Sequence, residues 1–131
     1  MSKYYNKNYT KDQIDAIVQK IHECVSNGKC TVAMNENRAE NLAFIREYNL
    51  NTEKQRHLLM QIDTKDFCHT LNNMKPGYEH EVLYVFCPQA TLFSLDDEEN
   101  QLDLYTKFNI IEMPTGSRVV VISFHKLNKP Y

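Results

Sequence analysis

The sequence has no long hydrophobic run. Its apolar stretches, such as the four residues 119–122, are far shorter than the roughly 20 residues that a membrane-spanning helix needs. The first ten residues, MSKYYNKNYT, are polar and contain no apolar core like that of a secretory signal peptide. We therefore expect a cytoplasmic protein that does not bind membranes.

Cysteine occurs, but not in a metal-binding or disulfide pattern. The four cysteines, Cys24, Cys30, Cys68 and Cys87, are scattered, and no two of them form a C-x-x-C pair. Cys68 and His69 are adjacent, and no second pair has the spacing of zinc ligands. We expect reduced, mostly packed thiols, with no metal site and no cofactor.

The chain also has little net charge. Fifteen Lys plus Arg residues stand against seventeen Asp plus Glu residues, which gives a formal net charge of −2 at pH 7. This balance argues against a general nucleic-acid coat protein. A local basic cleft stays open, because a nuclease that acts on one phosphodiester needs only a few cations at the scissile bond.

At 131 residues the chain has the length of one domain, and we expect residues 1–131 to fold as a single unit. Residues 1–9 are polar and tyrosine-rich without periodicity, and we expect this segment to be flexible. Thr10 and Gln13 then form a capping-box pattern before apolar residues at helical spacing, which end at Asn27-Gly28. This pattern predicts the first helix.

Two further helices are expected in the first half of the chain. Residues 30–34 could form a short strand or an extended link, and the second helix is predicted over residues 38–49. Asn51 or Thr52 would cap a third helix. A turn or short helix is expected to begin at residues 63–67 and to end at a Lys-Pro-Gly motif.

The last third of the chain has the composition of β-strands. Residues 81–86, 101–111 and 118–125 are rich in Val, Tyr, Phe and Ile, and turn residues separate them. A short strand at 91–93 could precede the acidic run 96–99. Because helices come first and strands follow, the sequence predicts an α+β fold in which N-terminal helices pack on a C-terminal antiparallel β-sheet.

Alternation assigns the side chains of the last two strands to two faces. The apolar sets are Leu104, Phe108 and Ile110 in one strand, and Val120, Ile122 and Phe124 in the other. Tyr105 and Lys107 then share the opposite face, as do Ser123 and His125. A five-residue loop over 113–117 would place Tyr105 opposite His125. The same register would place Lys107 opposite Ser123.

A phenol, an ammonium and an imidazole on one sheet face could cut RNA without a metal. The 2′-hydroxyl must lose a proton as it attacks the neighbouring phosphate, the 5′ oxygen must gain one, and the extra charge must be stabilised. Histidine can serve either proton-transfer role, and lysine can hold the phosphate. Spacing alone does not distinguish this site from a half-buried sheet whose outer face is merely polar.

Six short motifs follow one another in a recognisable order over roughly Ile14 to His125. They are NGKC, RAENLAFIREYNLNTEKQRHLLMQI, DTKDF, VLYVFC, LYTKF and VVVISFH. This order resembles the MqsR (motility quorum-sensing regulator) family of toxins. The resemblance implies a RelE-like fold and a sequence-selective, usually metal-independent endoribonuclease, an mRNA interferase. It also implies two partners, an RNA substrate and a cognate antitoxin protein.

The resemblance implies four catalytic candidates. Tyr105 and Lys107 match the tyrosine and lysine strand of the family, and His125 falls where a basic residue follows Ser-Phe. His69 falls where some members have a catalytic lysine. Our hypothesis is that His69 and His125 transfer protons while Lys107 and Tyr105 stabilise or position the phosphate.

Three further residues are candidates for binding the RNA. Tyr84 stands where the family commonly has tryptophan, and Arg38 and Arg56 could flank an RNA path. The alternative is a non-catalytic protein-binding module on the same scaffold, such as a phage or mobile-element inhibitor of a host protein. The near-neutral charge, the histidine in place of lysine at position 69 and the acidic run motivate this alternative.

Overall fold

The computed structural model describes residues 5–34 and 39–127, and these residues have an α+β fold. The helices are α1 (Lys11–Ser26), α2 (Ala39–Glu47), α3 (Thr52–Met60) and the short 3-10 helix η2 (Thr64–Asp66). The strands are β1 (Tyr5–Asn6), β2 (Cys30–Val32), β3 (Phe67–Asn72), β4 (Val82–Phe86), β5 (Gln89–Phe93), β6 (Glu99–Met113) and β7 (Gly116–Lys126). The predicted fold class, helices followed by strands, is confirmed.

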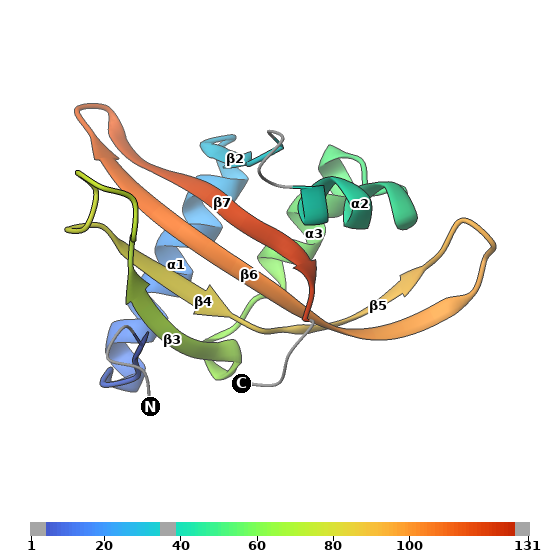
Figure 1. The fold of residues 1–131 in the computed structure, drawn as a ribbon, viewed down its shortest axis with the longest axis horizontal. Helices are drawn as coiled ribbons and strands as arrows, with labels where there is room; N and C mark the ends of the chain where they lie inside the picture. Colours follow the sequence, from blue (N-terminus) through green and yellow to red (C-terminus); the bar gives the residue numbers. More distant parts are fainter. Residues whose placement is uncertain (1–4, 35–38, 128–131) are drawn as a thin grey trace.

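The strands form one sheet in the order β1-β3-β4-β6-β7-β2, and β5 pairs with the first part of β6. Only the pairing of β2 with β7 is parallel among the described strands. In Figure 1, α1 passes behind the sheet. The hairpin arm, which consists of β5, its turn and residues 99–103 of β6, extends beyond the rest of the sheet (Figure 1). No helix in the described part of the chain is long and apolar enough to span a membrane.

The first helix forms where the sequence predicted it. The Thr10 hydroxyl accepts a hydrogen bond from the Gln13 backbone N–H at 3.2 Å, and the Gln13 side chain accepts one from the Thr10 backbone N–H at 2.8 Å. At the other end Gly28 has a φ of 71°, which glycine adopts without strain. The apolar stripe packs into the core through Ile14, Val18, Ile21, Cys24 and Val25.

The second helix lies within its predicted range, and the third begins where a cap was predicted but ends at Met60, before Ile62, which was expected to belong to it. The second spans Ala39–Glu47, inside the expected 38–49. Of the two candidate caps of α3, Asn51 is the cap, because its side-chain oxygen accepts a hydrogen bond from the Lys54 backbone N–H at 2.9 Å. These helices contribute to the same core as α1 through Phe44, Leu58 and Leu59, and the link between them contributes Tyr48 and Leu50.

Strands β6 and β7 pair in the register that the sequence predicted for their polar residues. The pairs are Tyr105 with His125 and Lys107 with Ser123. The predicted five-residue loop is wrong, because pairing continues to the strand ends and leaves only residues 114–115 between them. A β-bulge restores the register, since β7 contains one extra residue, Ile122, between two successive pairs.

The same bulge decides which side chains of β7 face the helices. Val119 and Val121 are fully buried in the core that the helices cover. After Ile122 the alternation resumes in the opposite phase, so Phe124 is buried in the same core. The predicted apolar set, which combined Phe124 with Val120 and Ile122, is therefore wrong. The prediction that Phe124 faces away from its two polar neighbours holds.

The segment after η2 is a strand, and the predicted continuation of a turn or short helix is wrong. η2 covers only Thr64–Asp66, and β3 follows it directly. Strand β3 pairs with β4 on one side and with β1 on the other. Neighbouring strands therefore supply its backbone hydrogen bonds, and this pairing overrides a weak local pattern. β1 lies within the N-terminal segment that the sequence predicted to be flexible.

Asn41 of α2 holds the edge of β7 where β2 ends. Its side-chain amide is buried and donates hydrogen bonds to the backbone oxygens of Ala33 at 2.9 Å and Ile122 at 3.0 Å. Its side-chain oxygen accepts a hydrogen bond from the Phe124 backbone N–H at 2.8 Å. One side chain thus satisfies backbone groups of the bulge residue, of Phe124 after it, and of Ala33 directly after β2.

Replacing Asn41 by alanine should lower the free energy of unfolding by about 3 kcal/mol, because buried backbone groups lose their partners at about 1–3 kcal/mol each. Asn41→Asp should be at least as destabilising, since it replaces both donors by an acceptor. Urea unfolding followed by circular dichroism would measure both losses. Arg46→Ala, at an exposed position of the same helix, is the control and should change stability by less than about 0.5 kcal/mol. An Asn41→Ala protein as stable as this control would contradict the assigned role.

Candidate functional site

The four predicted catalytic residues lie on the face of the sheet opposite the helix-covered core, which we call the outer face. Cross-strand pairing forms a row that begins at His69 on β3 and runs through Val85 to Lys107. Tyr105 and His125 form the next row, two residues further along β6 and β7. Because directly paired residues point to the same face, the structure brings the four candidates to one surface.

His125 is held in one orientation. Its ring stacks on the Tyr105 ring, with centroids 5.4 Å apart and an interplanar angle of 22°. Its Nδ1 lies 2.8 Å from the Lys126 carbonyl oxygen, which can only accept, so Nδ1 carries a proton and donates the hydrogen bond. The Glu40 carboxylate lies 3.8 Å from the same nitrogen. Proton exchange with a substrate would therefore take place at Nε2.

On the outer face, the candidate site is buried on the side of β3 and β4 and partly exposed on the side of β6 and β7. His69 is only 2 % exposed, and its neighbours Leu83 and Val85 are also buried. The three remaining candidates are half-buried, namely Tyr105, Lys107 and His125. A substrate would therefore reach the β6 and β7 side of this face more easily than the β3 side.

The surroundings of His69 favour its uncharged form. Burial is the largest cause that lowers the pKa of its imidazole, and the positive charges of Lys7 and Lys107 act in the same direction. Its neutral form is therefore favoured down to a lower pH than for an ordinary histidine. His69 is thus an electrostatic neighbour of Lys107 as well as a candidate base.

Two residues near the site carry no signal in the sequence. Lys7 acts on His69 because β1 pairs with β3, and the N-terminal segment shows no pattern that predicts this pairing. Glu40 comes close to His125 because α2 packs beside β7. Both depend on contacts between distant parts of the chain, which periodicity does not reveal.

Two of the three predicted RNA-binding residues, Tyr84 and Arg56, do not join this face. Tyr84 pairs with the fully buried Phe108 and packs against the helix-side core. Burial is the largest cause that raises the pKa of its phenol, and the electrostatic effect of Tyr9 acts in the same direction. Arg56 is exposed on α3, and its guanidinium donates a hydrogen bond to the Ser26 carbonyl at 3.3 Å. Arg38 lies outside the described residues.

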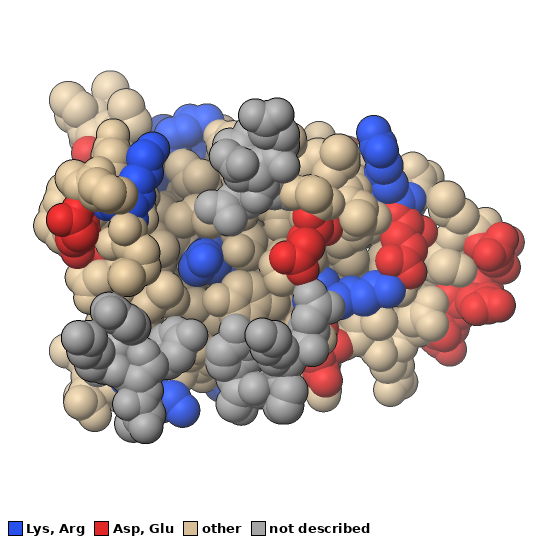
Figure 2. Space-filling view, viewed as in Figure 1, with Lys and Arg blue, Asp and Glu red and all other residues tan. Residues whose placement is uncertain are grey.

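The acidic run is far from the candidate site. Asp96 and Asp97 belong to the turn of the hairpin arm, and β6 begins at Glu99. At about 3.3 Å per residue, the stretch of β6 from Glu99 to Lys107 spans roughly 26 Å, about three Debye lengths at physiological salt. In Figure 2 the acids gather at the end of the arm, away from the cations over the sheet. Repulsion between this run and RNA at the site is therefore weak.

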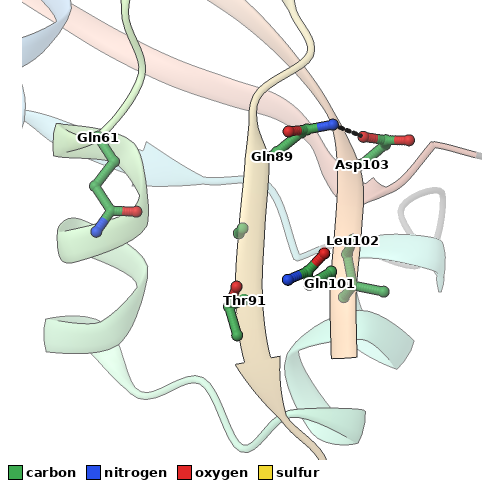
Figure 3. A pocket seen from close by; sticks show the side chains of 7 residues that line it. Gln61, Gln89, Thr91, Gln101, Leu102 and Asp103 are labelled. Carbon is green, nitrogen blue, oxygen red and sulfur yellow. Dashed lines mark hydrogen bonds between the residues drawn. The ribbon is translucent and has the colours of Figure 1, made fainter. Parts of the chain in front are cut away.

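A separate cavity of about 570 Å³ lies between α3 and the hairpin arm (Figure 3). Its lining consists of Gln61, Gln89, Ala90, Thr91, Gln101, Leu102 and Asp103. Gln89 donates a hydrogen bond to Asp103 at 3.1 Å across the two strands of the arm. This lining contains no lysine or arginine, so the cavity is unsuited to phosphate. Within the described residues, no three His, Cys, Asp or Glu side chains are grouped to hold a metal ion.

Replacing Lys107 by glutamine should raise the pKa of His69, because one of the charges that disfavour its imidazolium form is removed. The pKa should stay below its ordinary value, since burial is the largest cause and remains. NMR titration of the histidine rings would measure the change. Lys54→Gln, at an exposed position of α3, is the matched control and should leave the His69 titration unchanged. An unmoved His69 midpoint in Lys107→Gln would refute the coupling.

Comparisons of the chain with protein-family models, with curated proteins and with solved structures found no match.

Proposed function

We propose that this chain is an mRNA interferase, a metal-independent, sequence-selective endoribonuclease that acts as the toxin of a type II toxin–antitoxin pair. The observation that carries the proposal is the pairing that sets Tyr105 beside His125 and Lys107 in the adjacent row. These residue types supply the proton transfer and charge stabilisation that RNA cleavage needs. The motif order that resembles the MqsR family supports the same function.

His125 is the group best suited to proton transfer at the scissile bond. Its Nδ1–H can stay bonded to the Lys126 carbonyl whether the ring is neutral or charged, so Nε2 can take up or release a proton without ring movement. Lys107 would balance the extra negative charge of the phosphate as the 2′-hydroxyl attacks. The Tyr105 phenol would donate a hydrogen bond to a phosphate oxygen or to the leaving 5′ oxygen.

His69 would act on the site through Lys107. Three strand spacings of about 4.8 Å separate β3 from β7, so His69 and His125 are roughly 14 Å apart or more at their backbones. One phosphate cannot contact both rings over that distance unless the sheet deforms. We therefore assign proton transfer to His125, keep Tyr105 as a hydrogen-bond donor to the reacting phosphate group, and give His69, beside Lys107, a supporting electrostatic role.

The hairpin arm favours a protein partner. Phe93 and Leu95 are 59 % and 70 % exposed on this protruding element, and large exposed apolar side chains often mark protein contacts. They lie beside the acidic run, which would complement a basic surface. A cognate antitoxin is the partner that fits the proposed function. The second candidate function, a non-catalytic module that binds a host protein, depends on the same arm.

Purified protein should cleave RNA in the presence of EDTA and leave 5′-hydroxyl ends, because the 2′-hydroxyl is the proposed nucleophile. His125→Ala should slow cleavage by about 100-fold or more, within the range that general acid–base catalysis contributes. Lys107→Ala should slow it by about 100-fold, since it removes charge stabilisation. Mapping 5′ ends of RNA from cells that express each protein, together with growth curves, would measure both effects in vivo.

Matched controls exist on the far side of the molecule. His57 and Lys54 are exposed on α3, and their alanine variants should cleave RNA at the wild-type rate. A neighbouring gene whose small product blocks cleavage would support the antitoxin. A folded wild-type protein that leaves RNA intact and does not arrest growth would reject the nuclease and favour the binding module.

A further inference from the structure

Two of the four free cysteines, Cys68 and Cys87, lie close together where the start of β3 adjoins the end of β4. Cys68 is the extra residue of a β-bulge that precedes His69, and Cys87 directly follows the last residue of β4. The Asp66 carbonyl oxygen accepts a hydrogen bond from the Cys87 backbone N–H at 2.8 Å, and the Cys68 sulfur lies 3.9 Å from the same oxygen. Both residues therefore contact the same carbonyl oxygen, that of Asp66.

The two thiols differ in acidity. The hydrogen-bonding interaction with Cys87 lowers the pKa of Cys68, and the charge of Lys7 adds to this effect against the opposing effect of burial. The pKa of Cys87 is raised, first by the Cys68 thiol and then by burial. Burial also raises the pKa of Cys24, and it raises that of Cys30 to about 11. Cys68 is thus the only described cysteine whose surroundings favour a thiolate.

We propose that Cys68 and Cys87 form a thiol–disulfide exchange site that reacts with small disulfides such as oxidised glutathione. The Cys68 thiolate attacks one sulfur of the small disulfide, whose S–S bond breaks, and one glutathione thiolate leaves and takes up a proton. Cys87 then loses its proton and attacks the Cys68 sulfur, which releases the second glutathione. Two protein thiols are oxidised to one disulfide, and the small disulfide is reduced to two thiols.

This site has the features that exchange requires. Both cysteines are half-buried, whereas Cys24 is buried. Cys30 is also half-buried, but burial raises the pKa of its thiol to about 11. The bridge would join the bulge of β3 to the end of β4, directly before His69 in the chain. Oxidation would therefore change the surroundings of the His69 ring, and this effect does not depend on the proposed nuclease activity.

The first experiment equilibrates the full chain in mixtures of reduced and oxidised glutathione, followed by acid quenching, alkylation and mass spectrometry. The wild type should lose the mass of two hydrogen atoms and yield a cross-linked peptide pair that contains Cys68 and Cys87. Cys24 and Cys30 should remain alkylated. Cys87→Ser should stop after the first step with glutathione on Cys68, and Cys68→Ser should form neither product.

Cys30→Ser is the matched control, since it makes the same change of sulfur to oxygen outside the site and should still form the bridge. NMR should show a displaced His69 ring signal in the oxidised wild type and an unchanged signal for the exposed His57. Circular dichroism would verify that each serine variant is folded. A wild type that keeps all its thiols, that carries only glutathione adducts, or that bridges Cys24 to Cys30 would overturn the proposal.

Discussion

The hydrogen bonds of the buried Asn41 amide are the constraint on which the outer face of this sheet depends. Strand β2 pairs with β7 only as far as Val121, and beyond that point the edge of β7 has no neighbouring strand among the described residues. Asn41 takes the place of one, because it bonds to the Ile122 oxygen and to the Phe124 N–H. An unpaired buried backbone group would cost about 1–3 kcal/mol, so this contact fixes both the docking of α2 and the path of β7.

The path of β7 in turn decides where His125 lies. Strict alternation from the buried Val119 and Val121 would send Ser123 and His125 into the helix-side core. The extra residue, Ile122, reverses the phase, so that Phe124 fills the core and the imidazole reaches the outer face. A bulge beside a functional surface is a common way to redirect a side chain. The bulge at Ile122 thus both buries Phe124 in the core and places His125 on the outer face.

These dependencies explain what could be predicted from the sequence. Capping residues and helical periodicity are local, so α1 and the cap of α3 follow directly from them. The pairing of Tyr105 with His125 was also predicted correctly. The predicted loop is too long and shifts the register by one residue, and the bulge at Ile122 compensates for that shift. Strand β3 and the approach of Lys7 depend on β1, whose segment has no pattern. The helix-side position of Tyr84 was missed because family position does not fix the face of a strand.

The electrostatics of the outer face connect the open and closed halves of the site. Lys107 disfavours a proton on His69, so by the reciprocity of linked equilibria anything that neutralises Lys107 must favour that proton. A phosphate bound at Lys107 would do so, and the buried imidazole would become more basic as the charge of the substrate increases. The coupling needs no contact between His69 and the RNA, because the electrostatic interaction between Lys107 and His69 is weakly screened in low-dielectric surroundings. If the proposed nuclease activity is present, His69 would influence it through Lys107. Neither the burial of His69 nor its distance from His125 prevents this role.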